Sequence, residues 1–267
     1  MTKVIPHAPY VTSLPWISHY GCKYVVHGDD ITSDSSGEDC YRFVKSAGRF
    51  RVVKRTPGIS TTDLVGRMLL CTKSHFIHSF ERVLTAEYGQ GDEDERRKNA
   101  EEMKKRLHDY ASDETGQKPG VEVWTWRHES ARLKRSMTYP AKEHQGPKHE
   151  RHSKDDKGVF RKMVSGKPPR KGQRLIYVDG GFDLFSSGHM EFLKCVTIAE
   201  EKAAREKGWY EEKARNDRKS ACGYDYGPIY VVAGIHDDEV INHWKGFNYP
   251  VMNIFERGLC VLQCKVG

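Results

Sequence analysis

The chain has 267 residues, of which 37% are hydrophobic and 10% aromatic, so it can fill the core of one large domain or two small ones. No apolar run approaches the ~20 residues of a membrane span, and this excludes an integral membrane protein. The net charge of +7 is uneven, because residues 121–174 carry 15 Lys or Arg against 6 Asp or Glu. The rest of the chain is close to neutral, so total charge alone does not predict a nucleic-acid partner.

Seven cysteines are spread along the chain without a CxxC pair. Most stand in apolar or helical patterns, which are typical of reduced thiols packed inside a protein. The sequence therefore predicts buried, unpaired thiols and a cytoplasmic location. These cysteines are Cys22, Cys40, Cys71, Cys195, Cys222, Cys260 and Cys264.

In the first ordered part, residues 1–75, short apolar runs predict strands at residues 23–26 and 50–53 with a helix at residues 38–47 between them. A second helix is expected to begin near Thr62, because Leu64, Val65, Met68 and Leu69 follow at helical spacing.

The middle of the chain is its most polar part, with 38 charged residues among the 90 from 81 to 170. We expect residues 76–171 to form a charged linker, in which residues 92–109 are a solvated helix or disordered. Residues 124–139 mix aromatic and basic side chains. A solvated loop is expected there, and contact with lipid headgroups or RNA is the alternative.

In the second ordered part, residues 172–267, strands are predicted at residues 175–178 and 228–232. Helices are expected from Gly188 onward and at residues 237–244 and 253–263. The inner face of the first of these helices is assigned to Met190, Phe192, Leu193 and Val196. Strands that alternate with helices predict an α/β fold with a Rossmann-like, doubly wound parallel sheet.

Three segments have the composition of an anion-binding site. Ser60, Thr61 and Thr62 come where a helix begins, so their hydroxyls and the free backbone N–H groups can bind a phosphate, with Arg55 close by in sequence. A simple N-cap at Ser60, completed by Asp63, is the alternative.

The second segment, His27-Gly28-Asp29-Asp30, follows a predicted strand and so lies at the edge where open α/β sheets bind ligands. Two adjacent carboxylates can meet an ammonium group or a metal there, and a plain turn is equally consistent. Tyr10 offers an aromatic face to a cationic headgroup, or packs in the core.

The third segment runs from Asp179 to His189, with a glycine turn after a strand and a histidine at the start of a helix. Such a histidine can donate to a phosphate during transfer, or it can merely cap the helix. Lys245, followed by Gly246, is a candidate for a second phosphate ligand, although a single Lys-Gly pair is a weak signal.

Taken together, these motifs resemble the cytidylyltransferase family of HxGH nucleotidyltransferases, over about 170 of the 267 residues. The stretch from Arg55 to Thr62 is similar to the RTxGIST signature, which in the family binds the CTP phosphates. The matches in the remaining segments are Ala8-Pro9-Tyr10, His27-Gly28-Asp29-Asp30, Gly181-Phe182-Asp183, Ser187-Gly188-His189, Lys245-Gly246 and Glu256-Arg257.

The resemblance implies catalytic roles for His189, Lys245 and Arg55, and binding of a phospho-alcohol by Tyr10 and Asp30. It further implies that the nucleotide is bound by Gly181, Phe182, Ser186, Ser187, Gly188, His27, Gly28, Asp29, Thr56, Gly58, Ile59, Ser60, Thr61 and Thr62.

The chain departs from the family pattern at two points, and both bear on the catalytic and binding roles that the resemblance implies. Ser186 stands in the position of the first HxGH histidine. Residues 1–75 match only the carboxyl-terminal half of one family domain, and residues 172–267 match only the amino-terminal half of a second. We therefore expect an internal fragment of a tandem-domain enzyme. Because the halves are complementary, they are expected to pack as one circularly permuted domain; otherwise each exposes a sheet edge.

The tandem-domain branch of the family implies that CTP and phosphoethanolamine are the substrates and that CDP-ethanolamine and pyrophosphate are formed. Mg²⁺ is expected with CTP, without an organic cofactor or a metal held by the protein. No nucleic acid and at most weak contact with a membrane surface are expected, and a dimer is left open. The alternatives are a catalytically impaired nucleotide-binding or regulatory remnant, and an enzyme for choline phosphate or glycerol phosphate, against which the two-domain layout argues.

Overall fold

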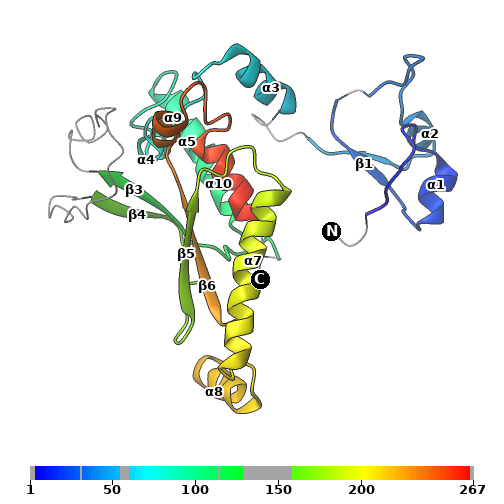
Figure 1. Cartoon of the computed structure of the whole chain (residues 1–267). Helices are drawn as coiled ribbons and strands as arrows, with labels where there is room; N and C mark the ends of the chain where they lie inside the picture. Colours follow the sequence, from blue (N-terminus) through cyan, green and yellow to red (C-terminus); the bar gives the residue numbers. More distant parts are fainter. Residues whose placement is uncertain (1–3, 31, 55–59, 114, 129–157, 265–267) are drawn as a thin grey trace. The chain divides into compact units, whose positions relative to one another are not determined.

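The computed structural model describes residues 4–30, 32–54, 60–113, 115–128 and 158–264. The chain divides into two compact units, Met1–Ser60 and Thr61–Gly267, which we call unit 1 and unit 2. Each unit contains one pair of parallel strands, and Figure 1 labels the elements. The predicted α/β class with parallel strands is therefore confirmed.

Unit 1 is a small strand–helix–strand unit. It contains α1 (Leu14–His19), β1 (Val25–His27), α2 (Arg42–Ser46) and β2 (Phe50–Val52). Val25 lies opposite Phe50 in the parallel pair, and α2 forms part of the crossover between the strands. Cys40, which lies just before α2, and Val44 within α2 are both fully buried. The carboxyl ends of both strands therefore lie at one edge, as predicted for His27 and its neighbours.

Unit 2 contains a parallel pair and an antiparallel hairpin. Its elements are α3 (Thr61–Leu70), α4 (Phe80–Leu84), α5 (Glu93–Tyr110), β3 (Val123–His128), β4 (Gly158–Val164), β5 (Arg174–Gly180), α7 (Ser187–Glu206), α8 (Glu212–Cys222), β6 (Ile229–Ile235), α9 (Asp238–Lys245) and α10 (Ile254–Gln263). Strands β5 and β6 pair in parallel over their full length, and β3 pairs with β4. The start of α10 follows from its sequence, because the side chain of Asn253 accepts from the Glu256 backbone N–H at 3.0 Å.

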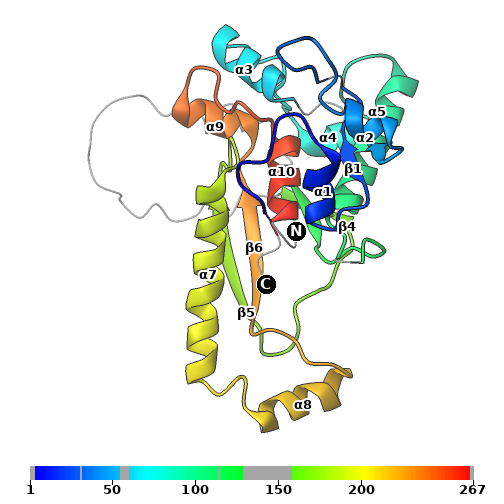
Figure 2. The same ribbon diagram turned by 90° about the vertical axis from the view of Figure 1, so that its right-hand side faces the viewer.

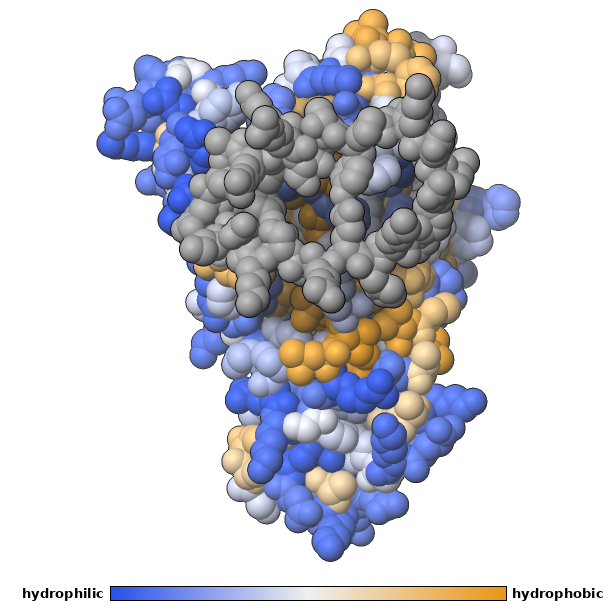
Figure 3. Space-filling model, turned by 60° about the vertical axis from the view of Figure 1, so that its left-hand side comes forward, coloured by the Kyte–Doolittle hydropathy of each residue, from blue (hydrophilic) through white to orange (hydrophobic). Residues whose placement is uncertain are grey.

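One face of the β5–β6 sheet is covered by α7. Val178, Phe182 and Leu193 form the centre of that core, and Figure 2 shows α7 running beside both strands. On the opposite face Leu175 and Tyr177 are 64% and 66% exposed. Figure 3 brings this side forward and shows apolar residues gathered over the sheet. Within the described part of unit 2, Leu175 and Tyr177 on this face are thus not covered by a helix.

Part of the predicted linker is built into unit 2, which corrects that prediction. Helix α5 buries Ala100 and Leu107, and Leu107 belongs to a core cluster together with Leu84 of α4, Val164 of β4 and Leu259 of α10. Its two buried positions stand seven residues apart and form a stripe too narrow to stand out among the charges. The stripe is buried because α10 supplies an apolar partner from far along the chain.

Two other burial predictions are also wrong in part. On α7, Leu193 is buried, but Met190 and Phe192 are 48% and 46% exposed. No residue of α3 is buried, although its apolar residues have helical spacing. All seven cysteines are free thiols as expected, yet only Cys40 is buried. Helical spacing indicates which residues share a face, whereas their burial depends on what packs against that face.

Asp225, which follows α8, forms ion pairs with two arginines of that helix, and these pairs predict how the stability of the fold depends on pH. Hydrogen bonds from Arg218 (2.6 Å) and Arg215 (3.1 Å) reach Asp225, and mainly the first of them lowers the pKa of Asp225 to about 2. A lowered carboxyl pKa stabilises the fold above the unfolded pKa of about 4, and this contribution is lost as the pH falls toward 2. The melting temperature of Asp225→Asn should therefore lie below that of the wild type from pH 8 to 5. The two should converge between pH 4 and 2, whereas a constant difference would contradict the ion pair.

Candidate active site

The turn between β5 and α7 forms the centre of the candidate site in unit 2. Phe182 and Leu184 adopt positive φ angles of 50° and 47°, which fold the chain back tightly after the strand. A Cβ atom on Gly181 would lie 3.3 Å from Ile241 of α9, so glycine allows the turn to approach that helix. Phe182 is 4% exposed and packs in the core. Its predicted nucleotide contact is therefore corrected to a structural role for the side chain.

His189 lies in the first turn of α7 with its ring held on two sides. The Ser186 backbone N–H donates to His189 Nδ1 at 3.1 Å, and the ring stacks on Phe185 with centroids 5.3 Å apart. Because Nδ1 accepts this bond, the neutral ring carries its proton on Nε2. Ser186, Ser187 and Gly188 beside it are exposed. The histidine therefore does take part in capping the helix, and the same contact leaves Nε2–H as a donor for a ligand.

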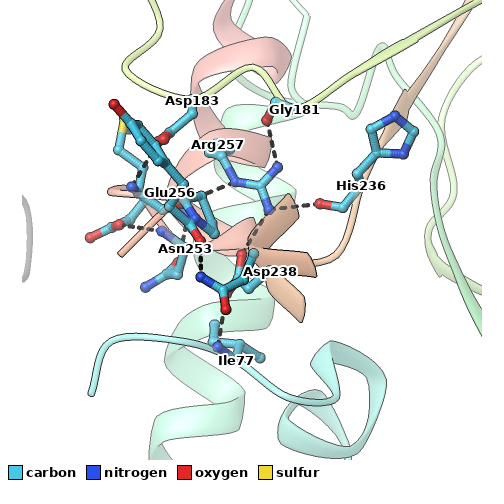
Figure 4. A network of polar contacts seen from close by, with 12 residues as sticks. Ile77, Gly181, Asp183, His236, Asp238, Asn253, Glu256 and Arg257 are labelled. Atoms are coloured by element: carbon cyan, nitrogen blue, oxygen red, sulfur yellow. Dashed lines mark hydrogen bonds and ion pairs between the residues drawn. The ribbon is translucent and has the colours of Figure 1, made fainter. Parts of the chain in front are cut away.

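A fully buried arginine connects the elements around this turn, as Figure 4 shows. Arg257 of α10 donates to the carbonyls of Gly181 (2.5 Å) and His236 (2.7 Å), which follow β5 and β6. It also donates to the carboxylate of Asp238 (2.7 Å), and both side chains are 0% exposed. The other carboxylate oxygen of Asp238 accepts from the Ile77 backbone N–H at 2.8 Å. One side chain thus fixes the spacing of the two strand ends.

Two further carboxylates hold the loop before α10. Asp183 accepts from the backbone N–H groups of Val251 and Met252, both at 2.8 Å. Glu256 accepts from two nitrogens of Arg67 at 2.8 and 3.0 Å, which attaches α3 to α10. Although burial opposes it, the hydrogen bonds and charge of Glu256 raise the pKa of Arg67. These carboxylates are engaged with protein donors and therefore position the site.

Lys245 is the last residue of α9 and is exposed. Its ammonium group lies 5.8 Å from the centre of the Tyr249 ring. Gly246 follows with a φ of 71°, and Asn242 donates to the carbonyls of Phe247 (2.9 Å) and Tyr249 (2.7 Å). The side-chain amide of Asn242 therefore fixes the loop, and the lysine side chain can reach an anion from solvent.

In unit 1, the loop after β1 borders a pocket of about 330 Å³ lined by Gly28, Asp29, Asp30, Lys45, Phe50 and Val52. His27 Nδ1 is buried without a hydrogen bond, 4.0 Å from the Asp30 carboxylate. Tyr41 packs on His27 with centroids 4.7 Å apart. Burial, followed by the charges of Cys40, Asp30 and Tyr10, raises the pKa of Tyr41. The predicted residues Gly28, Asp29 and Asp30 thus line one pocket.

The predicted phosphate site is only partly covered by the structure. Arg55, Thr56, Gly58 and Ile59 lie outside the described residues. Thr61 and Thr62 open α3 and are exposed, as a ligand site at a helix start requires. Tyr10 is 69% exposed, and its hydroxyl donates to the Ser33 carbonyl at 3.4 Å, so the alternative of core packing does not hold.

Sequence reasoning missed Asp238 and the central position of Arg257. The available signal was a charged Glu256-Arg257 pair in the middle of an otherwise apolar helix, at positions that periodicity places toward the core. A charge at such a position needs a buried partner, and Asp238 just after β6 was the nearest acid at a sheet edge.

Comparison of the sequence with known proteins shows which proteins this chain resembles. Residues 1–67 match the family model described as cytidylyltransferase-like. Ethanolamine-phosphate cytidylyltransferase from Mus musculus is 36% identical over 269 residues, which cover 98% of this chain and 52% of the relative. Residues 1–67 thus match a cytidylyltransferase-like family model, and nearly the whole chain is similar to ethanolamine-phosphate cytidylyltransferases. It spans about half the length of the curated cytidylyltransferases that it matches from end to end.

Shorter stretches of this chain match other relatives. Ethanolamine-phosphate cytidylyltransferase from Saccharomyces cerevisiae is 59% identical over 68 residues, or 26% of this chain and 21% of the relative. Choline-phosphate cytidylyltransferase 2 from Arabidopsis thaliana is 36% identical over 87 residues, or 32% of this chain and 29% of the relative. The relatives from Mus musculus and Dictyostelium discoideum, each matched over 98% of this chain, are both named ethanolamine-phosphate cytidylyltransferase.

Proposed function

We propose that this protein transfers the cytidylyl group of CTP to phosphoethanolamine, forming CDP-ethanolamine and pyrophosphate. The observation that carries the proposal is the similarity over 98% of the chain to relatives named ethanolamine-phosphate cytidylyltransferase. The contact at His189 supports it, because Nδ1 accepts from the Ser186 backbone N–H and Nε2 is left to donate to a phosphate oxygen at a helix start.

In the proposed reaction, a phosphate oxygen of phosphoethanolamine attacks the α-phosphorus of CTP in line. The bond between the α-phosphorus and the bridging oxygen breaks, and pyrophosphate leaves with its electron pair. His189, Lys245 and Arg55 neutralise the charge on the transferring and leaving oxygens, so catalysis consists mostly of positioning and electrostatics. Mg²⁺ enters as part of the nucleotide substrate.

For the phospho-alcohol, unit 1 offers an anionic surface near an aromatic ring. Asp29 and Asp30 line the pocket after β1, and Tyr10 is exposed in the same unit. We propose that Asp30 and Tyr10 bind the ammonium end of phosphoethanolamine, by charge and by the face of the ring. Exchange of Asp30 for asparagine should raise KM for phosphoethanolamine more than KM for CTP.

The test of the function is pyrophosphate release by the full chain with Mg²⁺–CTP and each of three phospho-alcohols: ethanolamine, choline and glycerol phosphate. Release that is fastest with phosphoethanolamine supports the proposal. Calorimetric binding of CTP without any release would instead identify a nucleotide-binding remnant. Faster release with choline or glycerol phosphate would overturn the choice of substrate.

Ser186→His restores a second imidazole beside His189. Loss of one transition-state donor costs about 3 kcal/mol, so the exchange should raise kcat up to about a hundredfold. KM should change little, because the added contact forms with charge that develops in the transition state. Ser186→Ala is the control, since it removes the hydroxyl without adding a donor. Equal kcat values for both variants would contradict a catalytic position at residue 186.

We also propose a cytoplasmic location, which the seven free thiols support. A second proposal is self-association, which the exposed apolar residues on the open face of the β5–β6 sheet support. No helix in the described ranges is long and apolar enough to cross a membrane. Sedimentation velocity of the full chain, with Leu175→Lys as the comparison, tests self-association through this face.

A further inference from the structure

The loop that follows Lys245 is organised around one side chain of α9, that of Asn242. This residue lies three positions before Lys245, in the last turn of the helix. Its backbone carbonyl accepts from the Gly246 N–H at 2.8 Å, which closes the helix. Its side-chain amide donates to the carbonyls of Phe247 at 2.9 Å and Tyr249 at 2.7 Å. One residue thus holds both the end of α9 and the chain that follows it.

The orientation of this amide is set by a cation from another segment. Lys73, which lies between α3 and α4, donates from Nζ to Asn242 Oδ1 at 3.0 Å. Because an ammonium group can only donate, the amide oxygen faces Lys73 and the amide NH₂ group faces the loop carbonyls. Asn242 is half-buried, which reduces the competition of water for these hydrogen bonds. The amide therefore holds the loop in one defined pattern.

Tyr249 connects the Asn242 amide to the Lys245 ammonium. The ammonium lies 5.8 Å from the centre of the Tyr249 ring, within the range of a cation–π attraction. The Tyr249 backbone N–H donates to the Gly246 carbonyl at 3.2 Å, so the loop turns back toward the helix. Since Asn242 holds the carbonyl of the same tyrosine, loss of that hydrogen bond releases the ring beside which Lys245 lies.

The far end of the loop is tied to the candidate active site. Val251 and Met252 donate their backbone N–H groups to Asp183 of the β5–α7 turn, both at 2.8 Å. His75 Nε2 forms a hydrogen bond of 2.8 Å with the Pro250 carbonyl. Because β5 and β6 are parallel, this turn and α9 follow strand ends at the same edge of the sheet, as Figure 1 shows. A loop held at both ends can place a lysine before the ligand binds.

We infer that Asn242 is a positioning residue for cytidylyl transfer. By holding the loop after α9, it places the Lys245 ammonium to bind the phosphate oxygens of the nucleotide. The inference rests on the proposed function, in which Lys245 neutralises charge on those oxygens. Asn242 acts through Lys245, so its effect on phosphate binding and on turnover should disappear when Lys245 is removed.

The test is a double-mutant cycle of Asn242→Ala and Lys245→Met, read by calorimetric binding of inorganic pyrophosphate with Mg²⁺ to the full chain. Alone, Asn242→Ala is expected to weaken pyrophosphate binding about fivefold and to lower kcat about tenfold, because a displaced lysine loses its contact with the phosphate. In the Lys245→Met background the same exchange should change either quantity by less than about twofold. Near-ultraviolet circular dichroism checks that each variant is folded.

Asn242→Asp tests the donated hydrogen bonds at constant side-chain size. The carboxylate keeps a partner for Lys73 but places an oxygen against the carbonyls of Phe247 and Tyr249. Because oxygens that only accept cannot pair with one another, this variant should weaken pyrophosphate binding at least as much as Asn242→Ala.

Gln173→Ala is the matched control, because Gln173 also carries an amide that joins backbone groups. It donates to the carbonyls of Gly227 at 2.9 Å and Ile229 at 3.1 Å, and it accepts from the Arg170 N–H at 2.6 Å. These contacts lie at the opposite end of β5 from the candidate active site. Removal of this amide should leave pyrophosphate binding and kcat unchanged.

A loss of binding in Asn242→Ala that vanishes in the Lys245→Met background and is absent in Gln173→Ala supports the inference. Equal losses in both backgrounds, no loss in Asn242→Ala, or unchanged binding by Asn242→Asp overturns it. A wild type that binds pyrophosphate but releases none from CTP and phosphoethanolamine overturns the proposed function, and the binding cycle still decides the role of Asn242. A wild type that neither binds nor releases pyrophosphate overturns both.

Discussion

Replacement of Arg257 by methionine is expected to destabilise unit 2 by about 3–5 kcal/mol, because it leaves the fully buried carboxylate of Asp238 without its counter-charge. Three carbonyls lose their donor in the same step, namely those of Gly181, His236 and Met252. Urea unfolding followed by circular dichroism measures the loss. Arg257→Lys keeps the charge but lacks the guanidinium fork, so an intermediate loss is expected.

Arg174→Met is the matched control for this prediction. Arg174 pairs with Glu200 at 2.9 Å but its side chain is 54% exposed, so its removal should change the free energy of unfolding by less than about 1 kcal/mol. A further exchange of Asp238 for leucine in the Arg257→Met background should restore part of the stability, since no charge then stays buried. Similar small losses for Arg257→Met and Arg174→Met would show that the buried network does not hold the fold.

Exchange of His189 for alanine is expected to lower kcat for cytidylyl transfer by about a hundredfold or more. The physical reason is the loss of an Nε2–H donor whose ring is fixed by Ser186 and Phe185 before substrate binds. The affinity for CTP should change only a few fold, because the donor acts mainly on charge that develops in the transition state. Pyrophosphate release and calorimetric CTP binding together separate these effects.

His108→Ala serves as the control for this experiment. His108 is an exposed histidine on α5, and its ring nitrogen lies 3.9 Å from the carboxylate of Asp109. Its removal should leave kcat and CTP affinity unchanged. If His189→Ala keeps the wild-type kcat, then His189 only caps α7 and the charge on the transferring phosphate is neutralised elsewhere.

Local sequence was sufficient for most elements that position the site. The apolar run at residues 175–178 predicted β5, and Asn253 with Glu256 marked the start of α10. The polar loops after β1 and β5 lie at the strand ends where the pattern placed them. These predictions hold because strand alternation, caps and glycine turns depend on neighbours within a few residues.

Burial within unit 2 could not be predicted in the same way. In sequence α5 looks like a solvated helix, but Leu107 is buried in a core to which α10, about 150 residues later, contributes Leu259. The apolar residues of α3 also have helical spacing in sequence, yet no residue of that helix is buried. Periodicity carries no information about which distant segment, if any, meets a face.

The sequence by itself determined the α/β class, the strand ends that carry the candidate ligands and the resemblance to cytidylyltransferases. Tertiary structure alone decided that Arg257 and Asp238 form a buried pair, that Phe182 is core, and that Trp126 and Phe160 share one face. The physical reason is that elements form through local hydrogen bonds and side-chain spacing. Burial, ion pairing and shared surfaces arise only when segments far apart in the chain come into contact.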